Sequence, residues 1–143
     1  MEKTDGGFLI SQIKQLQARA FEKMLRDSGV DAFNGAQGRI LYVLWERGRL
    51  TISDIGRLTS LAKTTLTGML DRMEASGLVI RTPDPRNRRQ IHIELTEQAR
   101  GYREAYDRLS REMGERFYQG FSDGEIEGFE HQLRRILRNL ESD

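Results

Sequence analysis

The residues of this chain best suited to chemistry are three arginines, Arg86, Arg88 and Arg89, in the short run Pro83–Arg89. The prolines and the Asx residues of this run favour a turn. Like charges held this close repel one another, so an anionic partner would explain them, and phosphate is the commonest such partner. The run therefore predicts a turn that binds phosphate, with a merely solvated charged turn as the alternative.

Upstream of this turn, an apolar row at helical spacing predicts a helix that ends before Gly77. The row is Leu66, Met69, Leu70 and Met73. The opposite face and its flanks carry small or polar side chains: Thr64, Thr65, Thr67, Gly68, Asp71 and Arg72. Small side chains let a helix enter the major groove of DNA, where threonine can bond to a base or phosphate. An ordinary surface helix is the alternative reading.

Two β runs, Leu78–Thr82 and Gln90–Leu95, flank the basic turn and predict a hairpin. Before the polar-faced helix, Thr51–Asp54 resembles a capping box that opens a short helix through about Leu58. Helix, short turn, helix and basic hairpin together predict a winged helix-turn-helix. The fold class is mainly α with a small β-hairpin (α+β).

Residues for catalysis are scarce in this sequence. It has no cysteine, no Gly-rich phosphate loop and only two histidines, His92 and His131, far apart in the chain. Thiolate metal sites, disulfides and thiol sensors are therefore excluded, and a histidine metal site or catalytic triad is not expected. We predict that the protein is not an enzyme and needs no cofactor.

The charge is distributed unevenly along the 143 residues, although the net charge is only +1. Residues 57–90 hold seven basic and three acidic side chains, whereas residues 97–143 hold eight basic and eleven acidic ones. The positive region thus coincides with the helix and turn that would meet DNA. No apolar run approaches a membrane span and the N-terminus lacks a signal peptide, so a bacterial-type cytoplasmic, nucleoid-associated location is expected.

Both ends of the chain carry apolar seams near heptad spacing, which predicts a homodimer. We expect a helix over residues 6–28, a central helix over 34–47 with Trp45 in the core, a long helix from Thr96 to about Tyr118, and a last helix after Ser122. The residues expected to form the dimer interface are Leu9, Ile13, Leu16, Ile126, Phe129, Leu133, Ile136, Leu137 and Leu140.

The chain resembles the MarR family of bacterial transcriptional regulators. The resemblance depends on four runs: Leu70–Glu74, Gly77–Val79, Asp84–Arg89 and Leu95–Glu97. It differs at Asn87, where the family usually has aspartate, at Ala62, where a helix-capping residue is common, and at Gln98-Ala99, where a glycine is common.

The resemblance implies a repressor that binds a palindromic operator as a homodimer and that a small aromatic effector releases. It also implies that Arg81 holds Asp71 and so positions the wing, with Arg88 as the alternative partner. The pocket residues for an effector are not identified by any motif.

These observations predict one MarR-like domain over 1–143, a DNA-binding lobe over 34–96 and dimerisation helices over 6–28 and 97–141. Two other classes stay open: a winged-helix module that binds protein, and an architectural protein that binds DNA without sequence preference. The residues predicted to contact DNA are Lys63, Thr64, Thr65, Thr67, Gly68, Arg72, Arg86, Arg88 and Arg89.

Overall fold

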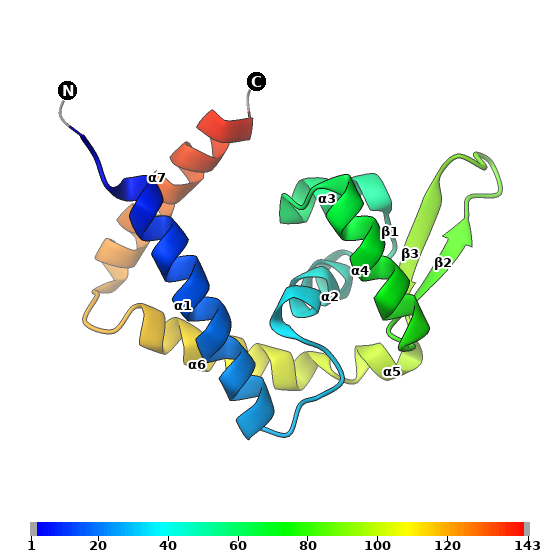
Figure 1. Cartoon of the computed structure of the whole chain (residues 1–143), viewed down its shortest axis with the longest axis horizontal. Coiled ribbons are helices and arrows are strands. Elements are labelled where there is room, and N and C mark those ends of the chain that lie inside the picture. The colour runs from blue at the N-terminus through cyan, green and yellow to red at the C-terminus, as the bar shows by residue number, and fades with distance from the viewer. Residues whose placement is uncertain (1–2, 142–143) are drawn as a thin grey trace. The chain divides into compact units, whose positions relative to one another are not determined.

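The computed structural model describes residues 3–141 and is mainly helical, with one small antiparallel sheet (Figure 1). This confirms the predicted fold class. The chain divides into two compact units, one up to Leu109 and one from Ser110; the single domain predicted from the sequence stays a prediction. The elements are α1 (Gly6–Asp27), α2 (Gly35–Arg47), β1 (Leu50–Thr51), α3 (Ile52–Thr59), α4 (Lys63–Ala75), β2 (Val79–Pro83), β3 (Ile91–Leu95), α5 (Glu97–Arg100), α6 (Arg103–Phe117) and α7 (Asp123–Glu141).

Side-chain caps fix the beginnings of several helices, because the first backbone N–H groups of a helix lack partners within it. Asn34 accepts from the backbone N–H of Gln37 at 2.8 Å, and the Gln37 side chain accepts from the backbone N–H of Asn34. Thr51 Oγ1 accepts from the backbone N–H of Asp54 at 3.1 Å, as the predicted capping box requires. These caps fix where α2 and α3 start.

The sheet has the strand order β1-β3-β2, with both pairings antiparallel. The β2–β3 hairpin confirms the predicted pair of strands. Its register places Thr82 opposite His92 and Arg81 opposite Ile93. The strand β1 was not predicted, because two residues are too short to show an alternating pattern.

The core of the first unit is one cluster of apolar side chains, mainly from α2, α3, α4 and the sheet, with Leu25, Ala99 and Leu109 from α1, α5 and α6. Trp45 is half-buried beside it, and its indole N–H donates to the carbonyl oxygen of Ala99 at 3.1 Å. Trp45, predicted to lie in the core, thus packs against the core without being fully buried in it. The largest fully buried side chains of α2 and α4 are Ile40, Leu41, Leu44, Leu66, Leu70 and Met73.

The prediction of one long helix from Thr96 to about Tyr118 was wrong. Thr96 does cap a helix, accepting from the backbone N–H of Ala99 at 3.1 Å, but α5 ends at Arg100. The backbone N–H groups of Gly101 and Tyr102 bond to carbonyls three residues back, so the α-helical ladder is interrupted there. Glycine is about 1 kcal/mol poorer than alanine inside a helix, which favours the interruption.

The last helix begins after Ser122, as predicted, and its start is a second capping box. The backbone N–H of Ser122 donates to Glu125 Oε1 at 2.9 Å, and the backbone N–H of Glu125 donates to Ser122 Oγ at 3.2 Å. Within the described residues, no helix is both long and apolar enough to cross a membrane.

The apolar seams of the terminal helices remain largely uncovered. In α1, Leu9, Ile13 and Leu16 are exposed, each by more than 40%. In α7, Ile126 and Leu133 are half-buried. Its remaining seam residues are exposed: Phe129, Ile136, Leu137 and Leu140. Each seam is thus available for a further packing partner.

Candidate nucleic-acid interface

Helix α4 presents the polar face that the sequence predicts. Its apolar row is fully buried, and the opposite side faces outward. The exposed residues of this outward side are Lys63, Thr64, Thr65, Thr67, Asp71 and Arg72, with Gly68 half-buried among them. Helix α4 therefore offers hydroxyls and cations on a surface kept low by a glycine, as entry into a major groove requires.

The first turn of α4 is weakly capped, as Ala62 predicts. No side chain bonds to its free backbone N–H groups. The Thr67 hydroxyl instead donates back to the carbonyl oxygen of Lys63 at 2.9 Å. The unpaired N–H groups at this exposed helix start remain available to an anion, and the helix dipole favours a negative charge there.

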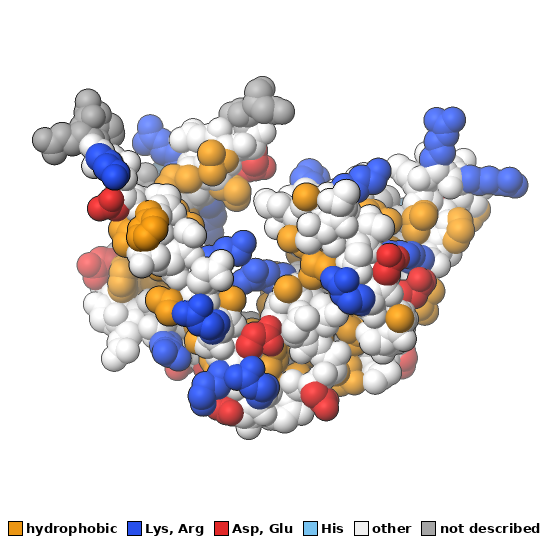
Figure 2. Space-filling model, viewed as in Figure 1, with side chains coloured by type: hydrophobic (Ala, Val, Ile, Leu, Met, Phe, Trp, Pro, Cys, Tyr) orange, Lys and Arg blue, Asp and Glu red, His pale blue; other side chains and the backbone are white. Residues whose placement is uncertain are grey.

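The turn between β2 and β3 carries Arg86, Arg88 and Arg89, and all three are exposed. Figure 2 shows basic side chains projecting from the end of this hairpin. Backbone bonds shape the turn: the N–H of Asp84 donates to the carbonyl of Gln90 at 3.0 Å. The turn, which we call the wing tip (Asp84–Gln90), therefore holds three cations clear of the rest of the molecule.

Within the wing tip, two side chains replace missing backbone partners. Asp84 Oδ1 accepts from the N–H of Arg86 at 2.8 Å, and Asn87 Oδ1 accepts from the N–H of Arg89 at 3.1 Å. Asn87, where the resembled family usually has aspartate, thus supports the backbone next to Arg89. An amide oxygen can accept this backbone bond, as a carboxylate oxygen can.

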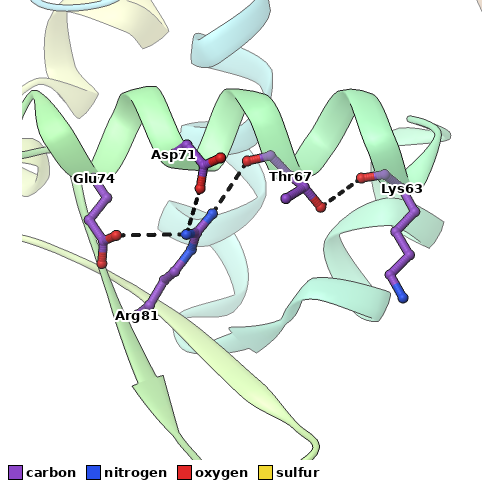
Figure 3. A network of polar contacts seen from close by, with 5 residues as sticks. All are labelled: Lys63, Thr67, Asp71, Glu74 and Arg81. Carbon is purple, nitrogen blue, oxygen red and sulfur yellow. Dashed lines mark hydrogen bonds and ion pairs between the residues drawn. The ribbon is translucent and has the colours of Figure 1, made fainter.

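Arg81 of β2 connects the hairpin to α4, as Figure 3 shows. Its Nη1 lies 2.7 Å from Asp71 Oδ1 and 3.7 Å from Glu74 Oε1, and its Nη2 donates to the carbonyl of Thr67 at 3.3 Å. The Arg81 side chain is only 22% exposed. The partner of Asp71 is therefore Arg81, as predicted, and not the alternative Arg88.

A hollow of about 400 Å³ opens between α3, the start of α4 and the wing. Its lining combines cations with apolar side chains and small polar groups, which suits a phosphate or a small organic anion. The α3 side of this hollow carries no sequence motif, and only the positive charge of Arg57 could have indicated it from the sequence. The lining includes Ser53, Arg57, Leu61, Lys63, Thr67 and Arg89.

Two carboxyl groups near this surface are stabilised in their charged form. The hydrogen bond from His92, and then the N–H of Arg86, hold the pKa of Asp84 below its ordinary value. The Thr51 hydroxyl beside Asp54 lowers the pKa of that carboxyl. Both carboxyl groups are held by local hydrogen bonds that favour their charged form.

Within residues 3–141, no group of three or more histidine, aspartate or glutamate side chains could hold a metal ion. His92 contacts Asp84, with its Nε2 3.1 Å from Asp84 Oδ2. The structure brings the predicted DNA-binding residues onto α4 and the wing tip; their contact with DNA stays a prediction.

Known proteins resemble this chain in both sequence and structure. The sequence profile of the MarR family matches residues 33–91, the segment from the start of α2 to the wing. The HTH-type transcriptional repressor IacR of Pseudomonas putida is 24% identical over 135 residues, which cover 94% of this chain and 79% of that protein. The next three curated relatives are matched over 38–58% of their own length.

Two solved structures show the same fold over nearly the whole chain. A mutant of MarR from E. coli, complexed with operator DNA, has a TM-score of 0.81 and 25% identity, covering 92% of both chains. AbfR of Staphylococcus epidermidis has a TM-score of 0.75 and 31% identity, covering 95% of this chain and 90% of that one.

Proposed function

The chain belongs to the MarR family of transcriptional regulators, and on that premise we propose that it is a sequence-specific DNA-binding repressor. The observation that carries this proposal is the α4 surface joined to a basic wing tip through Asp71 and Arg81. Relatives named as repressors and a neighbour complexed with operator DNA support the same reading. The protein acts at the bacterial chromosome in the cytoplasm, as a regulator and not as an enzyme.

In this proposal, α4 reads bases and the wing tip holds the backbone. Arg72 and the three threonines of α4 address the edges of bases in the major groove. Arg86, Arg88 and Arg89 contact phosphates or the adjacent minor groove. The ion pair between Asp71 and Arg81 neutralises a carboxylate that would otherwise repel phosphate, and it fixes the angle between hairpin and helix.

The regulator works as a two-fold homodimer on a near-palindromic operator. Its interface is formed by the exposed seams of α1 and α7, which present Leu16, Leu137 and Leu140 among others. The winged-helix lobes of the two subunits then bind half-sites about 34–36 Å apart, which is one turn of DNA. Light scattering of a chain lacking residues 126–143 tests this interface, because a well-folded dimer of that truncated chain would contradict it.

A small aromatic acid releases the regulator from DNA in this proposal, as the family resemblance implies. Release requires coupling of about 1–3 kcal/mol between ligand and DNA, and the coupling must be reciprocal. Titration with aromatic acids, followed by Trp45 fluorescence with and without DNA, tests it. Ligands that release DNA without this reciprocity would act by blocking the DNA surface directly.

The separate roles of α4 in base recognition and of the wing tip in backbone binding are tested with Arg88→Ala and Arg72→Ala. The DNA is an operator selected from random sequences. Arg88→Ala should weaken binding to all sequences. It should also reduce the salt slope, the steepness with which the logarithm of the binding constant falls with the logarithm of the salt concentration, by about 0.9 per lost phosphate contact. Arg72→Ala should cost about 1–3 kcal/mol at one base pair and relax the preference there. Arg135→Ala, at an exposed position of α7, is the matched control and should change neither quantity.

The same measurements separate the two other classes of protein. Equal affinity for selected and random DNA at physiological salt would indicate an architectural binder. No binding to DNA at all would indicate a module that binds protein. If Arg88→Ala keeps the wild-type salt slope, the assignment of the wing tip to the backbone is wrong.

A further inference from the structure

A second polar pair lies on the wing, on the face of the hairpin turned away from α4. His92 Nε2 of β3 lies 3.1 Å from Asp84 Oδ2. Their side chains are only 19% and 22% exposed, so the pair is partly shielded from water. A hydrogen bond in such a place is stronger than one on an open surface.

Asp84 is the residue through which this pair reaches the wing tip. Its second carboxylate oxygen accepts from the N–H of Arg86, its own N–H donates to the carbonyl of Gln90, and its carbonyl accepts from the N–H of Asn87 at 3.3 Å. Both carboxylate oxygens and both backbone groups are therefore engaged in the turn. A shift of this carboxylate would move the backbone that carries the wing-tip arginines.

The acidic partner of His92 is Asp84. In the sheet, His92 pairs with Thr82 of β2 and Thr51 of β1, which are both neutral. Glu94, two residues along β3, is paired with Arg49, whose Nε lies 3.3 Å from Glu94 Oε1. That carboxylate is therefore already neutralised by its own cation.

We propose that His92 is a positioning residue for DNA binding: it fixes the wing tip through Asp84, and it does so more firmly when its imidazole is protonated. A hydrogen bond between two charged groups is roughly twice as strong as one between neutral groups. The affinity for DNA should therefore decrease as the pH rises and the imidazole loses its proton. This inference rests on the proposed DNA-binding function.

The test uses the full-length chain and a fluorescein-labelled DNA duplex selected from a random library by the wild-type protein. Binding is titrated from about pH 5.5 to about pH 8 at constant ionic strength, because salt alone changes the affinity. The variants are His92→Gln, which retains an amide donor but does not titrate, and Asp84→Asn, which retains an acceptor for Arg86. His131→Gln, on exposed α7, is the matched control.

Across this range, the wild type and the His131→Gln variant should lose about threefold to tenfold more affinity than the His92→Gln variant. Asp84→Asn should show the same weakened pH dependence as His92→Gln. Parallel pH curves for the wild type and His92→Gln would overturn the inference. Failure of the wild type to bind DNA at every pH would instead overturn the proposed function.

A second measurement needs neither DNA nor a variant that folds. In ¹⁵N NMR spectra of the free wild-type protein, the backbone amide of Arg86 should shift with the same pH midpoint as the His92 imidazole. The Asn87 amide, which donates to Asp84, should follow it. If the Arg86 amide does not respond while His92 titrates, His92 does not position the wing tip.

Discussion

Replacement of Gly68 by alanine separates the stability of α4 from its fit to DNA. A Cβ built at Gly68 meets no atom outside its own helix backbone nearer than Arg72 Nη1, at 3.7 Å, which is ordinary van der Waals contact. Alanine is about 0.8–1.0 kcal/mol better than glycine inside a helix, so the free energy of unfolding should rise by about that amount. For a chain of this size the gain corresponds to a melting temperature higher by roughly 3–4 °C.

The same methyl group should weaken DNA binding. Gly68 lies among the exposed threonines of α4, where an added side chain would hold the helix away from the groove floor. Loss of even one base contact costs about 1–3 kcal/mol, so the dissociation constant should rise about tenfold or more. The assays are thermal melting at one fixed protein concentration and fluorescence anisotropy on selected DNA.

Gly114→Ala in α6 is the matched control, because a Cβ built there has no neighbour within 4 Å. It should raise the melting temperature without changing the affinity for DNA, provided that light scattering gives an unchanged mass. An unaltered dissociation constant for Gly68→Ala would refute the placement of this face against DNA. A lower melting temperature would refute the open space inferred at Gly68.

Three further substitutions test the packing and the ion pair. Gly38→Ala places a methyl group 2.6 Å from Tyr106 Cε2, so urea denaturation should show a loss of about 1–3 kcal/mol; unchanged stability would contradict this close packing. Arg81→Met should weaken DNA binding. Asp71→Asn added to that variant should lower the DNA affinity little further, because the two residues form one ion pair. Additive losses of affinity in this double-mutant cycle would contradict the coupling of the two residues. Burial raises the pKa of Tyr118 to about 12, so its contribution to stability is present below pH 10 and is lost as the pH rises through 12. Tyr118→Phe should lack this alkaline loss in urea midpoints; an identical slope would contradict the assignment.

The local pattern of the sequence was enough to predict the main elements and the character of the site. The apolar row of α4, the alternation in β3 and the turn chemistry of the wing tip are short-range features, and each depends on residues a few positions apart. The basic surface and the exposed terminal seams follow from the same periodicity. The pairing of Arg81 with Asp71 came from the family resemblance, not from the spacing of the two residues.

What the sequence could not determine depends on contacts between residues far apart in the chain. The two-residue strand β1 exists only because β3 pairs with it, and its own residues carry no alternating signal. The interruption of the helix at Gly101 involves a change of backbone hydrogen bonding, which no side-chain pattern reports. The contact between Asp84 and His92 requires the turn to bring two strand ends together. Hydrophobic periodicity specifies which face of an element is buried, but the register and close packing that join elements are decided only when the whole chain is folded.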